Sequence, residues 1–218
     1  MNVIKGLITK DILQLKSYKK TLIIFIMIFA LTSISAQDGV ENMLVIMLTL
    51  GFGMFSMASF NYDEFNKADR YILTLPLTKK EVILSKYILV ICSTVIGSVI
   101  GILLSYIVIF AMNKQVPNIE EIISIGLGGI FGIGIIEAIQ IPCVYKWGAE
   151  KGRIQMLILT AVLGAILCIV AKVDIQLPAN NILNIFNTFL PLIFIGLTII
   201  IYYISYKVAY KIYNKKEI

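Results

Sequence analysis

The amino-acid sequence predicts an all-α membrane protein with six transmembrane helices, and its composition and the placement of its basic residues support this class. Hydrophobic residues make up 59% of the 218 residues and charged residues 15%, which leaves too little polar surface for a water-soluble globule. Of the 19 lysines and arginines, 17 lie in residues 1–20, 61–86, 146–153 and 207–218. Because short cytoplasmic loops accumulate basic residues, we expect both termini to face the cytoplasm.

The predicted elements follow one another within a single transmembrane domain, residues 1–218. An amphipathic interfacial helix is expected at 1–20, since apolar residues recur there at helical spacing and lysines occupy the other faces. Spans 1 and 2 lie in 21–60, a cytoplasmic segment in 61–86, spans 3 to 6 in 87–206 and a cytoplasmic tail in 207–218. With about 20 residues needed to cross a bilayer, the predicted spans are Thr21–Ala36, Met43–Phe60, Tyr87–Ala111, Ile122–Val144, Ile154–Ala171 and Ile182–Tyr206.

Local patterns predict how these helices begin and pack. Thr78 and Glu81 have the spacing of a capping box, and Leu77 and Val82 that of a hydrophobic staple, so the third helix should begin in the cytoplasm. Small residues recur every four positions in two spans, a pattern that lets helix backbones approach closely in lipid. These stripes are Ser93, Gly97, Gly101 and Ser105, and Ser124, Gly128 and Gly132. The polar stretch 174–191 predicts a short re-entrant or outer-surface helix.

Several kinds of chemistry are excluded by the residues that the sequence lacks. It contains no histidine, which removes His-based metal sites and Ser-His or Cys-His nucleophile pairs and disfavours an intramembrane hydrolase. Its three cysteines form no CxxC pair, and no phosphate-binding Gly-Lys-Ser or Gly-Lys-Thr occurs. The basic residues lie beside apolar spans rather than on a recognition helix, so we expect no nucleic-acid partner. Energy from ATP would have to come from another subunit.

Glu137 is the acid that lies well inside a predicted span. An ionisable group at this depth is costly and by default marks a pathway or a paired structural site. Three interpretations stay open: a structural pair or hydrogen-bonded neutral acid, a cavity-lining group, and a proton-coupling group. Gln140, one helical turn further, is positioned to share its contacts. We therefore take Glu137 and Gln140 as the candidate polar intramembrane site.

The cytoplasmic segment 61–86 reads NYDEFNKADRYILTLPLTKKEVILSK. A short helix over 69–75 would offer Ile72, Leu73 and Leu75 as apolar contacts for a groove on a partner. It would stop before Pro76, which disfavours helix at the preceding residue. From the residues alone, the alternative is a solvated loop that lies against lipid headgroups.

Two motifs closely resemble those of type 2 ABC exporter permeases from Gram-positive bacteria. The first runs from Asp69-Arg70-Tyr71 through Leu75-Pro76-Leu77, followed by Lys79-Lys80-Glu81 and Ser85-Lys86-Tyr87. The second is Ile141-Pro142 with Tyr145-Lys146-Trp147-Gly148 and Glu150-Lys151-Gly152-Arg153. Their order and spacing and the six-span layout agree over essentially the full length. Within the family, the chain is most similar to permeases that export phenol-soluble modulins, which are amphipathic cytolytic peptides.

The resemblance implies a permease of the bacterial plasma membrane that works with a second permease copy, as a homodimer, and with two separate ATP-binding subunits. ATP and magnesium would be bound by those subunits, with no cofactor in this chain, and the substrate would be an amphipathic peptide. The implied ATPase-coupling residues are Asp69, Arg70, Ile72, Leu73, Leu75, Pro76, Lys146, Glu150 and Arg153. The competing hypothesis is a non-transporting membrane scaffold or immunity protein that binds an amphiphilic toxin.

Overall fold

The computed structural model describes residues 2–35, 40–74, 77–152 except 112–118, and 181–215, together with residues 154, 155, 158, 161, 162 and 165. The described part is 95% helical and holds no strand, which confirms the all-α class. The helices are α1 (Asn2–Lys16), α2 (Lys19–Ser35), α3 (Val40–Phe65), α4 (Ala68–Thr74), α5 (Lys79–Ala111), α6 (Ile119–Trp147) and α8 (Asn181–Lys215).

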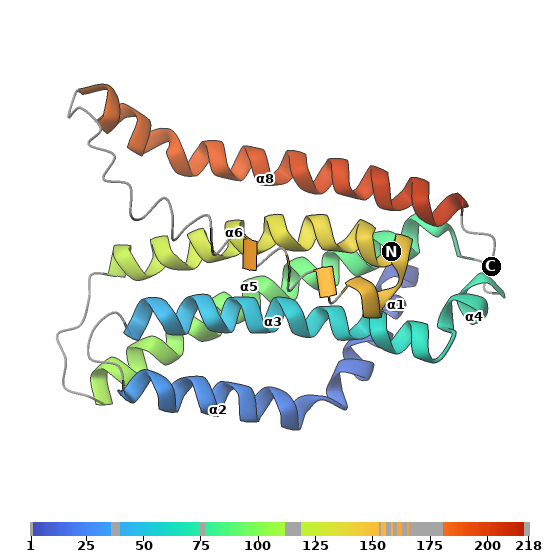
Figure 1. Ribbon diagram of the computed structural model, residues 1–218, viewed down its shortest axis with the longest axis horizontal. Helices are drawn as coiled ribbons and strands as arrows, with labels where there is room; N and C mark the ends of the chain where they lie inside the picture. The colour runs from blue at the N-terminus through green and yellow to red at the C-terminus, as the bar shows by residue number, and fades with distance from the viewer. Residues whose placement is uncertain are drawn as a thin grey trace.

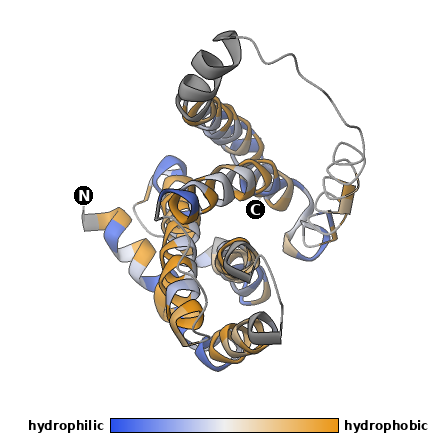
Figure 2. Cartoon of the chain, turned by 90° about the vertical axis from the view of Figure 1, so that its left-hand side faces the viewer, coloured by the Kyte–Doolittle hydropathy of each residue, from blue (hydrophilic) through white to orange (hydrophobic). Residues whose placement is uncertain are grey.

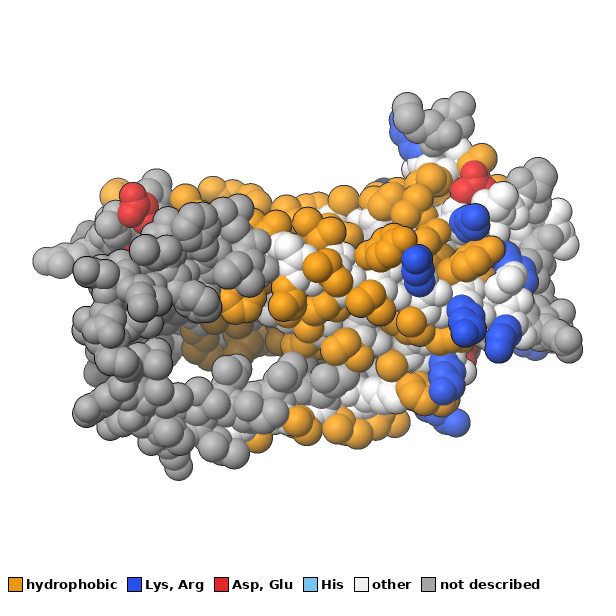
Figure 3. Space-filling view, turned by 90° about the horizontal axis from the view of Figure 1, so that it is seen from above, with side chains coloured by type: hydrophobic (Ala, Val, Ile, Leu, Met, Phe, Trp, Pro, Cys, Tyr) orange, Lys and Arg blue, Asp and Glu red, His pale blue; other side chains and the backbone are white. Residues whose placement is uncertain are grey.

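The long helices run along one axis, and the two short ones lie together at one end of the bundle. Figure 1 shows α2, α3, α5, α6 and α8 extending along the molecule, with α1, α4 and both chain termini at the same end. α3 is central, since it packs against α5, α6 and α2, while α8 packs mainly on α6. Lysines and arginines gather at the end that carries the termini (Figure 3). We call it the basic end.

Four of the described helices are long and apolar enough to cross a membrane: Met43–Phe65, Lys79–Ala111, Glu120–Trp147 and Phe194–Lys215. Viewed along the bundle, these helices consist largely of hydrophobic residues (Figure 2), many of which are exposed, as expected where lipid replaces water as the solvent. α2 has 17 residues. The predicted fifth span, Ile154–Ala171, lies mostly outside the described residues, so the count of six spans stays a prediction.

One predicted element is wrong in part. The polar stretch before the last span was expected to form a short helix of its own, but from Asn181 onward it is the first part of the continuous helix α8, which runs through Pro191. Residues 174–180 lie outside the described residues.

The predicted start of the third helix is confirmed. The backbone N–H of Thr78 donates to Glu81 Oε2 at 2.9 Å, and the N–H of Glu81 donates to Thr78 Oγ1 at 3.3 Å. This reciprocal capping satisfies two backbone donors at the helix start. Leu77 and Val82 belong to one apolar cluster, as the staple requires. The helix begins at Lys79, eight residues before the predicted span, because the capped first turns continue directly into it.

The glycine stripe of α5 packs as predicted, whereas the described residues make no close contact at two glycines of the α6 stripe. A Cβ at Gly97 would lie 2.6 Å from the Cβ of Phe52, so α3 approaches α5 closely there. At Gly128 and Gly132 a Cβ would meet nothing within 4 Å among the described residues. The contact with α5 is instead made through Gly126, whose carbonyl accepts a hydrogen bond from the Ser98 hydroxyl at 3.3 Å. The close approach predicted at Gly128 and Gly132 therefore stays a prediction.

Candidate functional site

Helix α4 confirms the predicted short helix in the cytoplasmic segment and lies against the bundle at the basic end. Its Ile72 is 5% exposed and packs with Leu7 of α1 and Val82 of α5. The expectation that Ile72 offers its side chain to a partner is therefore wrong in this conformation, because the chain's own helices cover it. Tyr71 points the other way and is 69% exposed. Five predicted coupling side chains lie outside the described ones: Asp69, Arg70, Leu73, Leu75 and Pro76.

The second motif forms a sharp turn at the same end of the bundle. Gly148 follows α6 with φ +89°, a left-handed conformation that favours glycine. Glu64, near the end of α3, accepts a hydrogen bond from the backbone N–H of Ala149, so a carboxylate from α3 holds the turn in place. Lys146 and Glu150 flank the turn and are exposed. Arg153 lies outside the described residues.

A hollow of about 560 Å³ separates the end of α3 from this turn. Phe65, the last residue of α3, is 86% exposed beside it. Of the residues that line the hollow, Glu150 alone was a predicted site residue, although an exposed aromatic residue at the end of a span, next to acidic residues, was a usable signal. The hollow is lined by Tyr18, Asn61, Tyr62, Glu64, Phe65 and Glu150.

Two lysines and two aspartates form a buried ionic cluster that joins α1 to α3 and α5. Lys86 Nζ lies 2.9 Å from Asp11 Oδ1 and 2.6 Å from Asp63 Oδ2. Lys10 Nζ lies 3.1 Å from Asp11 Oδ1 and 2.7 Å from Asp63 Oδ1. The formal charges cancel, which permits burial of Asp11, Asp63 and Lys86, whereas the Lys10 side chain stays 33% exposed. Burial lowers the pKa of Lys10, but its hydrogen bond to Asp63 and the charges of both aspartates outweigh burial and raise that pKa above its ordinary value.

The ionic cluster was missed at the level of sequence. Asp11 lies four residues after Leu7, on the face of α1 that turns toward the bundle. An acid on the packed face of an amphipathic helix indicates a buried partner, so this position was a usable signal. Which lysine pairs with it could be read only from the packing of α1 on α5.

Glu137 lies fully buried where four helices meet. Thr94 of α5 has its hydroxyl 2.9 and 2.8 Å from the two carboxyl oxygens, and the Tyr202 hydroxyl of α8 donates to Oε2 at 3.3 Å. Gly53 of α3 lies so close that a Cβ there would collide with the carboxyl group. Among the described residues no lysine or arginine pairs with Glu137. This enclosure favours the hydrogen-bonded structural interpretation over a cavity-lining one.

Gln140 does not share the contacts of Glu137. It is buried one turn closer to the basic end and lines a cavity of about 70 Å³ together with Asn61 and Met57. Its Oε1 has no hydrogen-bond partner within the described part of the chain. The two candidate residues thus occupy separate polar positions along α6.

Within the described residues, no group of three or more His, Cys, Asp or Glu side chains is placed to hold a metal ion. The buried carboxylates are each engaged otherwise, Asp11 and Asp63 by lysines and Glu137 by hydroxyl groups.

A family model for ABC-2 family transporter proteins matches residues 6–214. This chain belongs to that family. No curated protein and no solved structure matches it. As an ABC-2 permease, it is a multi-pass membrane subunit that works with an ABC ATP-binding partner and is not itself the ATPase. The ABC-2 match spans both motifs, the short helix α4 and the turn at Gly148.

Proposed function

We propose that this permease exports amphipathic peptides from the bacterial cytoplasm as a homodimer, driven by two copies of a separate ATPase that docks at the basic end. Both termini and α4 would face the cytoplasm in the plasma membrane. The observation that carries the proposal is the placement of α4, which lies at the basic end with one exposed face and one face packed against α1 and α5.

Motion of the ATPase subunits would reach the spans through packed contacts. Ile72 couples α4 to Leu7 and Val82, so displacement of α4 would move α1 and the capped start of α5 with it. The ionic cluster joins the same two helices to α3. Glu64 then links the end of α3 to the turn after α6. These contacts make the cytoplasmic ends of four helices a continuous packed unit, as transmission between a motor and a pathway requires.

Arg70, Leu73, Lys146 and Glu150 are proposed to contact the ATPase directly, with Tyr71 exposed beside them. Ile72 instead supports α4 from within. The hollow beside Phe65 is lined by residues that precede the first motif and by Glu150 of the second. It is the proposed seat for an element of the partner, since exposed aromatic residues are common anchors at protein interfaces.

The test uses the permease purified together with its ATPase and reconstituted in vesicles. We expect R70E and L73D each to lower ATPase binding and peptide-stimulated hydrolysis about tenfold, the effect of losing an interface anchor. K5E, a charge reversal at an exposed position of α1, is the matched control and should leave both unchanged. Unchanged binding and hydrolysis in R70E and L73D would refute the coupling assignment.

The substrate assignment has a separate readout. ATP-dependent uptake of a fluorescent amphipathic helical peptide is measured in inverted vesicles, against a peptide of the same composition whose scrambled order removes the apolar face. We expect uptake of the first peptide alone. Equal uptake of both, or uptake of neither, would refute amphipathic-peptide export while leaving the coupling assignment intact.

A further inference from the structure

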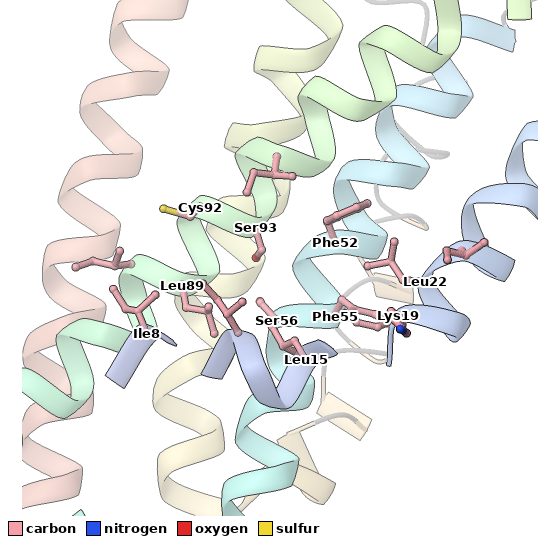
Figure 4. A pocket seen from close by; sticks show the side chains of 14 residues that line it. Ile8, Leu15, Lys19, Leu22, Phe52, Phe55, Ser56, Leu89, Cys92 and Ser93 are labelled. Atoms are coloured by element: carbon pink, nitrogen blue, oxygen red, sulfur yellow. The ribbon is translucent and has the colours of Figure 1, made fainter. Parts of the chain in front are cut away.

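A groove between α1, α2, α3 and α5 has no part in the proposed coupling. Its volume is about 490 Å³, within the range of about 300–1,000 Å³ that is typical of sites for small molecules. In Figure 4, Ile8 and Leu15 of α1 approach the groove from one side and Phe52 and Leu89 from the other. It is lined by Ile8, Ile12, Leu15, Lys19, Leu22, Ile23, Phe52, Phe55, Ser56, Ile88, Leu89, Cys92, Ser93 and Ile96.

The groove opens toward the surface that faces lipid. Ile12, Ile23 and Ile96 on its rim are 54%, 55% and 51% exposed. Ile23 and Ile96 belong to helices with many exposed apolar side chains, and Ile12 lies on the amphipathic helix α1. A ligand can therefore enter the groove laterally, from within the bilayer.

The lining offers hydrocarbon contact and hardly any free polar group. The hydroxyl of Ser56 already donates to the Gly53 carbonyl at 2.6 Å, and that of Ser93 donates to the Val90 carbonyl at 2.8 Å. A peptide backbone in the groove would leave its own N–H and C=O groups without partners, which is costly away from water. An unbranched hydrocarbon chain carries no such groups and suits the lining.

One charged residue stands at the edge of the groove. Figure 4 shows the Lys19 nitrogen beside Phe55. Among the described residues, Lys19 forms no ion pair. Lys16 and Lys20 are exposed next to it in the chain. Clustered lysines at a membrane surface attract anionic headgroups.

We propose that the groove binds one acyl chain of an anionic phospholipid from the leaflet at the basic end, with the lipid phosphate held by Lys19. The apolar lining accepts the chain, and the unpaired lysine at the edge is complementary to the charge of the headgroup. The bound chain lies between α1 and the bundle and thereby fastens α1 to α3 and α5. This inference is independent of the transported substrate.

The experiment places a fluorescent reporter in the groove of the full chain. The single tryptophan, Trp147, is replaced by phenylalanine, and Phe55 is replaced by tryptophan. The protein is reconstituted in vesicles that contain brominated phosphatidylglycerol or brominated phosphatidylcholine at equal mole fraction, and quenching is measured. We expect the anionic lipid to bind about fivefold more strongly, the effect of one lysine near an anionic surface.

Variants separate the headgroup contact from the hydrocarbon contact. K19Q should bring the preference for phosphatidylglycerol close to that of bulk lipid, while the matched control K211Q, at an exposed lysine on α8, should retain it. S93L should fill the groove and reduce quenching by both lipids. If K19Q does not fold, the test is the S93L variant, in which quenching by both lipids should be reduced.

Three results would overturn the proposal. The first is equal quenching by the two brominated lipids, and the second is quenching in S93L that matches that of the parent protein. The third is relief of quenching by an amphipathic peptide at a concentration that leaves the vesicles intact, which would make a peptide the occupant.

Discussion

Replacement of Lys86 by methionine tests the buried ionic cluster. Lys86 contributes one of its two positive charges and contacts both aspartates, at 2.9 and 2.6 Å. Without it, two buried carboxylates share Lys10 alone, and the formal charge of the cluster changes from zero to −1. The methionine keeps most of the aliphatic volume, so the loss reports on charge rather than on a cavity.

The expected magnitude follows from burial. Removing one partner of a buried ion pair costs about 3–5 kcal/mol because an uncompensated charge is left behind. The side chain of Lys86 is 5% exposed, and Lys10 still lies 3.1 and 2.7 Å from the two aspartates. We therefore expect a loss near the lower limit, about 3 kcal/mol. K10M should cost about 1 kcal/mol, since the 33% exposed side chain of Lys10 is partly screened by water.

The assay is the free energy of unfolding in mixed micelles, followed by circular dichroism as SDS is titrated. K5M, at an exposed lysine of the same helix as Lys10, is the control and should stay within about 0.5 kcal/mol of the parent. The double variant K86M/D63N restores a neutral cluster and should be more stable than K86M. A loss in K86M below about 0.5 kcal/mol, the level of a neutral surface change, or a larger loss in K10M than in K86M, would refute the reasoning.

Three further predictions concern close helix contacts. Gly148→Ala should lower stability by about 1–2 kcal/mol, since φ is +89° and the new Cβ would lie 2.6 Å from Glu64 Oε1; an unchanged midpoint in scanning calorimetry would contradict this. Glu137→Gln should cost less than about 1 kcal/mol, because size and hydrogen bonding are retained, and Glu137→Ala about 2–4 kcal/mol; equal shifts in SDS titration would contradict this order. Gly97→Leu should lower the free energy of unfolding by about 3 kcal/mol and Gly128→Leu by less than about 1 kcal/mol. If the two variants lowered the thermal aggregation temperature equally, the assigned packing faces would be contradicted.

Local patterns were readable from the sequence where neighbouring residues determine the structure. The capping box at Thr78 and Glu81 lies within one turn, so its geometry follows from the helix itself. The short helix α4 was predicted for a similar reason, since an apolar and charged run ends at a proline. The apolar stretches likewise predicted the long helices, although these extend beyond the apolar core because helices continue into polar surroundings.

Contacts between distant segments were not readable in this way. Small residues occupy two faces of α6, and only the position of α5 determines which face meets it. Gly126 contacts α5, whereas Gly128 does not. An apolar residue in a cytoplasmic segment suits either a partner or the chain's own core, and Ile72 takes the second role because Leu7 covers it. Lys86 was counted as one of many cytoplasmic lysines. Its pairing with Asp11, 75 positions away, requires α1 to fold back onto α5.

The most direct test of the proposed exporter is the side of the membrane on which α4 lies. Native cysteines are removed, and single cysteines are placed at the exposed positions Tyr71, on α4, and Glu120, at the start of α6. A membrane-impermeant maleimide is applied to intact cells and to permeabilised cells. We expect Glu120→Cys to react in intact cells and Tyr71→Cys to react only after permeabilisation. Labelling of Tyr71→Cys in intact cells would place α4 outside, beyond the reach of an ATP-driven partner, and would contradict the proposed function.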